Sequence, residues 1–132
     1  MTTEKLEFYR CEICGNFVQV IMGGGPVMHC CGQEMKHLVA NSNDGASLEK
    51  HVPVFIKENE GMCEIRVGEL PHPMLNEHYI MFIEVISNDK NKMQLQYLYP
   101  EQEPKMLLTS DWAKATAKEF CNIHGLWEGH ND

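Results

Sequence analysis

The chain has 132 residues, of which 43% are hydrophobic and 23% charged, the balance of a folded globular protein. Its formal net charge of -8 disfavours nucleic acid and anionic membranes as partners, because both bind clustered Lys and Arg. No apolar stretch reaches the roughly 18 residues of a membrane-spanning helix, and the N-terminus lacks the apolar core of a secretory signal. We therefore expect a cytoplasmic protein. In that compartment its six cysteines are expected to be metal ligands or catalytic thiols rather than disulfides.

The cysteines divide the chain into two parts. Cys11, Cys14, Cys30 and Cys31 all lie near the N-terminus, in a segment too short to bury an adequate core without a metal or disulfides. The small, polar run Asn41–Ser47 is typical of a linker. We expect a first domain over residues 1–38, a linker over 39–47 and a second domain over 48–132.

Short strand patterns follow one another along the second part. Residues 51–56 are β-branched around Pro53, which suits an edge or a strand start. The alternation over Met62–Val67 predicts a strand with Cys63, Ile65 and Val67 on the inner face and Met62, Glu64 and Arg66 on the outer face.

Tyr79–Ile86 is nearly continuous in apolar residues and predicts a buried central strand. A turn at Asn88–Asn91 then leads to a further alternating strand over residues 93–97. This spacing predicts an antiparallel sandwich or barrel. Ser110–Lys118 is ambiguous, because it could also begin a helix capped by Ser110.

The four early cysteines form the strongest motif. Cys11 and Cys14 are spaced C-x-x-C before a glycine, and a glycine-rich turn then returns the chain to Cys30 and Cys31. Four thiolates suit a tetrahedral Zn²⁺ or a single iron. Binding one ion through the adjacent Cys30 and Cys31 would strain the local geometry. The alternatives to metal binding are a disulfide pair or buried free thiols.

Two histidines, His29 and His37, lie near these cysteines in the sequence. Four thiolates already complete a tetrahedral shell. We therefore interpret both histidines as surface residues rather than as ligands.

The second constellation is weaker when taken from spacing alone. His51, His72 and His78 are scattered, and Cys121 and His124 lie three residues apart at a turn. They could hold a second metal, but the Cys–His pair could equally be a nucleophile and its base.

The flanking residues resemble a known family. Glu49–Val54, Pro71–Met74, Glu77–Ile80 and Cys121–Trp127 resemble desulfoferrodoxin, the two-iron superoxide reductase, over nearly the whole chain. The cysteine segment resembles its N-terminal desulforedoxin domain. The resemblance implies a mainly β protein, in which a small rubredoxin- or desulforedoxin-like domain precedes an immunoglobulin-like antiparallel sandwich. It favours a strand rather than a helix before Cys121.

The resemblance also implies two mononuclear irons per chain. The first would be held by the four early cysteines, and the catalytic iron by five ligands, namely His51, His72, His78, His124 and Cys121. The expected activity is one-electron reduction of superoxide to hydrogen peroxide, with re-reduction by a donor such as rubredoxin. A homodimer is implied as well.

We also expect individual roles for residues near this second site. Lys50 is the candidate for attracting superoxide and orienting a proton-donating water, and Glu49 for ligating the ferric ion; a solvated charge pair is the alternative. Trp127 and Tyr79 are expected to pack around the site. Cys63 is interpreted as a core thiol, and His130 as a bystander in a polar tail.

Three other functions remain open at this point. The four cysteines alone would also fit a zinc-ribbon binding module without catalysis. Both irons could serve only as a rubredoxin-like electron carrier. Dismutation, which would release oxygen as well as peroxide, is the third.

Overall fold

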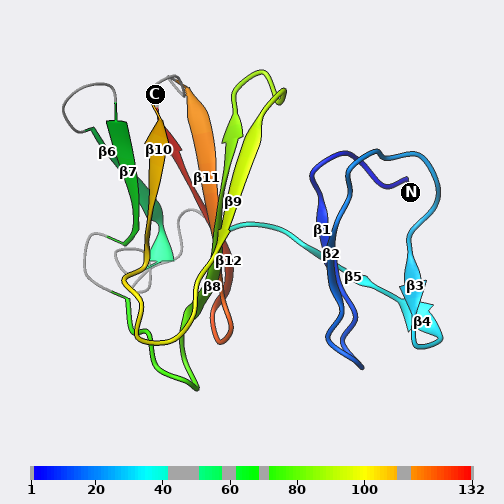
Figure 1. Cartoon of the computed structure of the whole chain (residues 1–132). Coiled ribbons are helices and arrows are strands. Elements are labelled where there is room, and N and C mark those ends of the chain that lie inside the picture. Colours follow the sequence, from blue (N-terminus) through cyan, green and yellow to red (C-terminus); the bar gives the residue numbers. More distant parts are fainter. Residues whose placement is uncertain (1, 42–50, 58–61, 69–71, 110–113, 132) are drawn as a thin grey trace. The chain divides into compact units, whose positions relative to one another are not determined.

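The computed structural model describes residues 2–41, 51–57, 62–68, 72–109 and 114–131. The twelve elements with assigned bounds in these ranges are strands, β1 to β12, and they fall into two compact units, Met1–Val39 and Ala40–Asp132 (Figure 1). The described ranges contain no helix of the length and apolarity needed to cross a membrane. The expected mainly β class is confirmed.

The first unit contains two small antiparallel sheets. One has the order β2–β1–β5, from Phe17–Gln19, Phe8–Arg10 and Lys36–Leu38; the other pairs β3 (His29–Cys30) with β4 (Gln33–Glu34). Its small core groups Cys11 with Tyr9, Val20 and Met35. Cys11, a candidate metal ligand, is therefore also part of this small core.

The glycine-rich turn of this unit has a steric reason. A Cβ on Gly23 would lie 2.2 Å from the carbonyl oxygen of Thr3, and the N–H of Thr3 donates to the carbonyl of Gly25 at 3.0 Å. Only glycine allows so close an approach of backbone to backbone. The turn therefore binds the N-terminal segment and returns the chain toward the second cysteine pair.

The second unit consists of two antiparallel sheets. One has the order β10–β7–β6, from Lys105–Thr109, Met62–Val67 and Pro53–Lys57. The other has the order β12–β11–β8–β9, from Gly125–Asn131, Ala115–Cys121, Ile80–Ser87 and Met93–Tyr97. Both sheets supply the core, for example Ile65 and Met106 from the first and Ile83 and Val85 from the second. The expected antiparallel sandwich is confirmed.

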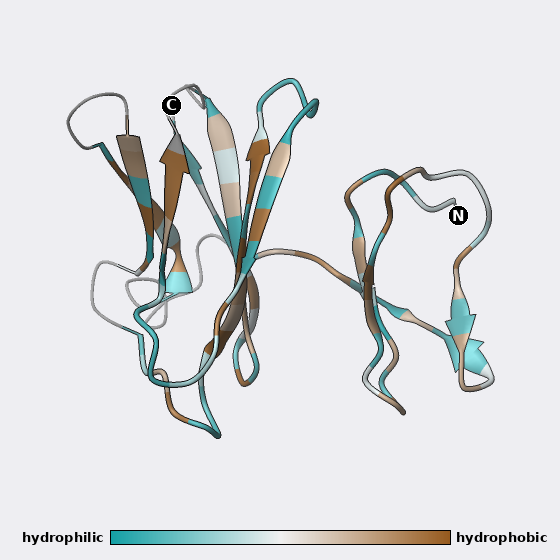
Figure 2. Cartoon of the chain, in the orientation of Figure 1, coloured by the Kyte–Doolittle hydropathy of each residue, from teal (hydrophilic) through white to brown (hydrophobic). Residues whose placement is uncertain are grey.

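Most strand predictions hold. β7 spans the predicted range, and β8 is a buried strand between two neighbours. The turn before β9 lies at 88–92, in a stretch that Figure 2 shows as hydrophilic. β11 runs directly into Cys121, so the helix alternative is wrong from Lys114 onward; residues 110–113 lie outside the described ranges.

The alternating strand β9 is an edge strand. Its apolar side chains, Met93, Leu95 and Tyr97, are exposed. Its glutamines reach the neighbouring strand β10 instead, because Gln94 Nε2 donates to the Leu107 carbonyl at 3.1 Å and Gln96 Nε2 to the Lys105 carbonyl at 3.3 Å. These amides connect the edges of the two sheets.

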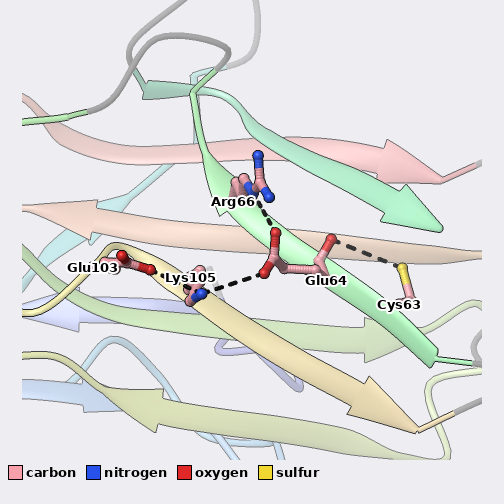
Figure 3. A network of polar contacts seen from close by, with 5 residues as sticks. All are labelled: Cys63, Glu64, Arg66, Glu103 and Lys105. Atoms are coloured by element: carbon pink, nitrogen blue, oxygen red, sulfur yellow. Dashed lines mark hydrogen bonds and ion pairs between the residues drawn. The ribbon is translucent and has the colours of Figure 1, made fainter. Parts of the chain in front are cut away.

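One face assignment was incomplete. Cys63, Ile65 and Val67 do pack toward the core, and Arg66 is exposed, but Glu64 is only 4% exposed. Its carboxylate forms ion pairs with Arg66 on the same strand and with Lys105 on β10, as Figure 3 shows. A buried carboxylate is retained here because two cations lie against it.

A close backbone contact joins the start of β6 to the end of the other sheet. A Cβ on Gly129 in β12 would lie 2.1 Å from the carbonyl oxygen of Pro53, so only glycine fits. Pro53 follows His51 by two residues, and Gly129 follows Trp127 by two. The contact therefore places His51 beside the hairpin that carries the last ligand candidates.

Candidate metal centres

The first centre brings together all four predicted cysteines. Their sulfur atoms lie within 4.8 Å of one another. Cys14 Sγ is 3.6 Å from Cys30 Sγ, and Cys30 Sγ is 3.9 Å from Cys31 Sγ. No cysteine of the described residues forms a disulfide, so that alternative is wrong for this structure.

Left-handed backbone at two places makes this cluster possible. Gly15, with φ of 86°, closes the first turn, and its N–H donates to the Cys11 carbonyl at 2.9 Å. Cys31 itself has φ of 54°, and Gly32 follows with φ of 78°. The turn of the chain at Cys31 lets two adjacent side chains face one point. The strain expected for an adjacent pair is therefore located at Cys31, whose conformation is uncommon for a residue with a Cβ.

The electrostatics of the cluster favour a cation. Hydrogen bonding from the Cys14 N–H is the largest cause that lowers the pKa of Cys11, to about 6. Side-chain contacts with Cys14 and Cys11 raise the pKa of Cys31. Four thiols this close cannot all ionise without a compensating positive charge. The donor set therefore fits a tetrahedral thiolate-bound ion.

The two nearby histidines do not join this cluster. His29 is exposed. His37 stacks on Tyr9, with ring centroids 4.9 Å apart, and its Nε2 lies 3.4 Å from a carboxylate oxygen of Glu7. The expectation that neither is a ligand agrees with these positions, although His37 is half-buried rather than fully on the surface.

The second centre gathers residues from distant parts of the sandwich. His51 precedes β6, His72 and His78 lie between β7 and β8, Cys121 ends β11, and His124 lies in the turn to β12. Their five donor atoms lie within 4.8 Å of one another. Sequence spacing left this site undecided; the fold brings its residues together.

The ring nitrogens of three histidines converge on one point. His72 Nδ1 donates to the Pro73 carbonyl at 2.6 Å, which leaves Nε2 as the acceptor of the neutral ring. His72 Nε2 is 3.1 Å from His51 Nε2, which is 3.1 Å from His124 Nδ1. Burial lowers the pKa of His72 to about 4, so this ring is neutral at physiological pH. Converging neutral imidazoles fit a transition-metal ion.

The sulfur of Cys121 completes the group. Cys121 is fully buried, and the backbone N–H of His124 donates to its sulfur at 3.4 Å. Burial raises the pKa of the thiol, and the N–H groups of His124 and Ile123 lower it. The three-residue turn between Cys121 and Gly125 is closed by Gly125, with φ of 87°. The hairpin thus holds thiol and imidazole at the spacing that the sequence predicted.

Trp127 packs on this site as expected. Its ring stacks on His51, with centroids 4.9 Å apart and an interplanar angle of 23°, and Nε1 donates to the His124 carbonyl at 3.1 Å. The expected packing of the Tyr79 side chain stays a prediction. Glu49 and Lys50 lie outside the described residues.

The interpretation of the C-terminal stretch needs correction. His130 lies in β12 rather than in a tail, bonded to Thr116 and Glu128 and outside both clusters. Sequence reasoning also overlooked Glu119, a fully buried acid two residues before Cys121. Burial raises its pKa well above the usual value. The available signal was period-2 alternation, because Glu119 shares a face of β11 with the buried Ala115 and Ala117.

Two further residues escaped notice: Asn122, between two ligand candidates, and Gly129. A polar residue in a turn and a glycine in a strand are both too common to be read as positioning elements without the structure.

Fold and sites together define a class of two-centre β metalloproteins, with a small four-thiolate domain and a β sandwich that carries a four-histidine, one-cysteine site. The family model "Desulfoferrodoxin" matches residues 43–130, and "Desulfoferrodoxin, N-terminal domain" matches residues 3–38. The chain belongs to the desulfoferrodoxin family.

Three known proteins illustrate the similarity. The chain is 44% identical over 128 residues to a desulfoferrodoxin of Desulfarculus baarsii, covering 97% of this chain and 98% of the relative. It is 38% identical over 96 residues to a superoxide reductase of Pyrococcus horikoshii, covering 61% and 84%. The crystal structure of the superoxide reductase from Treponema pallidum superposes with a TM-score of 0.70 at 26% identity, covering 95% and 97%.

Proposed function

We propose that this chain is a superoxide reductase, which converts superoxide, one electron and two protons into hydrogen peroxide. The observation that carries the proposal is the group of four imidazoles and one thiol whose donor atoms lie within 4.8 Å, in a member of the desulfoferrodoxin family. One iron would be held by His51, His72, His78, His124 and Cys121, and a second by the four early cysteines.

The chain's own residues prepare the catalytic site. When bound, ferrous iron supplies the electron and a positive charge that attracts the anionic substrate. Burial keeps His72 neutral, and its bond to Pro73 fixes which nitrogen faces the centre. The N–H of His124 stabilises negative charge on Cys121, so the donor set carries a single negative charge.

The test of this proposal is metal analysis combined with an optical spectrum of the reduced protein before and after superoxide is added. Two irons per chain, and a ferric band that arises at the histidine site together with peroxide, are expected. A colourless zinc protein would favour a zinc-ribbon module. Failure to consume superoxide would leave an electron carrier, and release of oxygen would indicate dismutation.

Lys50, next to His51, is proposed to attract superoxide and to orient a proton-donating water. An acidic chain with a net charge of -8 repels an anion, so a local cation matters. Lys50→Ala should slow the second-order reaction with superoxide by about 10-fold or more at low salt, with iron content unchanged. Stopped-flow or pulse radiolysis measures this rate, and an unchanged rate contradicts the role.

Glu49 is proposed as the carboxylate that would bind the iron of the histidine site in its ferric form. Glu49→Ala should therefore leave the reduction rate unchanged and alter the spectrum of the oxidised protein. If turnover instead collapsed, Glu49 would act as a proton donor. Comparison with Lys50→Ala separates the two adjacent charges.

The first centre is proposed to be an accessory redox site that also stabilises its own domain. Four thiolates complete a tetrahedral shell, so this centre can pass an electron but has no position for superoxide. Cys14 and Cys31 are exposed, which suits exchange with a donor protein such as rubredoxin.

The remaining inferences concern assembly and organisation. We infer domains over residues 1–38 and 48–132 with a linker over 39–47. Within that linker, Asn41 pairs with Trp127 of β12.

We also infer a homodimer and a cytoplasmic location, without nucleic acid or membrane as partners. Sedimentation analysis tests the dimer, and cell fractionation tests the location.

A further inference from the structure

The side chain of Asn122 connects the two segments that carry His78 and Cys121. Its Oδ1 accepts a hydrogen bond from the backbone N–H of Tyr79 at 2.9 Å, and its Nδ2 donates to the carbonyl of Glu77 at 3.0 Å. Glu77 and Tyr79 are the two residues that flank His78. One amide thus holds the backbone on both sides of one ligand candidate, while its own residue adjoins another.

The segment around His78 forms an exposed turn at its tip. Leu75 and His78 close a tight turn, with N–H to carbonyl distances of 2.9 and 3.1 Å. Its residues Leu75, Asn76 and Glu77 are exposed. At its base, the Sδ of Met74 accepts from the N–H of Ile80 at 3.4 Å. The side-chain amide of Asn122 therefore attaches the tip to the β11–β12 hairpin, beside the backbone N–H of Asn122, which donates to the Tyr79 carbonyl at 3.2 Å.

A simple turn-forming role does not explain Asn122. The left-handed backbone of the hairpin is supplied by Gly125, with φ of 87°, and Asn122 is not among the residues with positive φ. An asparagine that formed the turn would occupy that left-handed position or bond to the backbone two residues further on. Both polar groups of the Asn122 side chain are instead directed at the segment of His78.

We propose that Asn122 is a positioning residue, which fixes the imidazole of His78 relative to the sulfur of Cys121. Hydrogen bonds behind a ligand set its orientation, and their loss commonly weakens metal binding by about 10-fold to 100-fold. The consequence for superoxide reduction rests on the proposed function. The consequence for metal binding rests only on the geometry of the site.

The matched pair of variants is Asn122→Ala and Asn76→Ala. Asn76 lies in the same turn as His78 and is exposed, so its replacement deletes the same kind of amide from the exposed tip of the turn. The backbone N–H of Asn122 donates to the Tyr79 carbonyl at 3.2 Å, and alanine keeps this N–H, which favours a folded variant. Asn122→Ser, whose hydroxyl cannot span both groups, is the milder variant.

Iron affinity of the histidine site is measured by competition with a chelator, and the ferric spectrum and reduction potential are recorded with it. Asn122→Ala should bind iron about 10-fold to 100-fold more weakly and shift the spectrum, with Asn122→Ser between it and the parent. The spectrum of the four-cysteine centre in the same chain is the internal reference and should not change. Asn76→Ala should match the parent.

Parent-like affinity, spectrum and potential in both Asn122 variants would overturn the proposal. Equal losses in Asn122→Ala and Asn76→Ala would also overturn it, because the effect would then belong to the turn. If Asn122→Ala does not fold, Asn122→Ser decides by the same measurements. A parent protein that binds iron but does not reduce superoxide contradicts the proposed function and leaves these binding measurements valid.

Discussion

The two metal centres of this chain are built in opposite ways. The four cysteines come from two short segments, and two left-handed turns at Gly15 and Cys31 aim their sulfurs at one point. The five donors of the histidine centre come from segments on both sheets of the sandwich. The first centre is thus made by local backbone, and the second by the tertiary fold.

This difference indicates which of the two units needs its metal in order to fold. The first unit has a small core that groups Cys11 with three other buried residues. The sandwich has a larger core to which both sheets contribute, and Cys121 of the second site is one member among many apolar residues. We therefore expect the metal to be structural in the first unit and largely functional in the second.

Removing the metals should have the largest effect of the tests of this comparison. Stripping both irons should unfold residues 2–39, because a structural tetrahedral ion contributes on the order of 10 kcal/mol of apparent binding free energy to folding. The sandwich strands should persist. Two-dimensional amide NMR of the stripped protein measures both parts at once, with Cys11→Ser as the matched variant. A first unit that keeps its amide dispersion without metal would contradict the comparison.

Gly129→Ala comes next in expected effect. A Cβ there would meet the Pro53 carbonyl at 2.1 Å, and a forced backbone shift of this kind typically costs about 1 to 3 kcal/mol. Because the same contact places His51, iron content of the histidine centre should fall while the four-cysteine centre stays filled. Denaturant unfolding and metal analysis measure the two effects.

The control for this variant is Gly24→Ala, since a Cβ at Gly24 meets nothing within 4 Å. It should change the unfolding free energy by less than about 0.5 kcal/mol. Equal losses in the two variants would show that the Pro53 contact is unimportant.

The cysteine centre is built by local backbone and the histidine centre by the tertiary fold, and this difference decides how well each can be predicted from the sequence. The cysteine centre is predictable because C-x-x-C, glycines and the adjacent pair lie within one short stretch. The histidine centre is not predictable from spacing, since His51 and His124 meet only when β6 and β12 come together. Resemblance to a family supplied that pairing.

Strand prediction shows the same limit. Alternation predicted β7 and its inner face, because period-2 patterning is local. It could not predict that Glu64 on the outer face is buried, because the covering cation Lys105 comes from β10. Burial of an outward residue depends on which strand becomes its neighbour.

Glu64→Gln should have a smaller effect than Gly129→Ala, and it tests whether charge away from both centres matters. The partners Arg66 and Lys105 have side chains 55% and 45% exposed, so solvent screens the ion pairs and the expected loss of stability is about 1 kcal/mol or less. Neither metal content nor either spectrum should change. Glu103→Gln, whose side chain is 75% exposed, should cost less still. A loss above about 3 kcal/mol for Glu64→Gln would mean that the burial of the Glu64 carboxylate, rather than solvent screening at its exposed partners, sets the strength of these ion pairs.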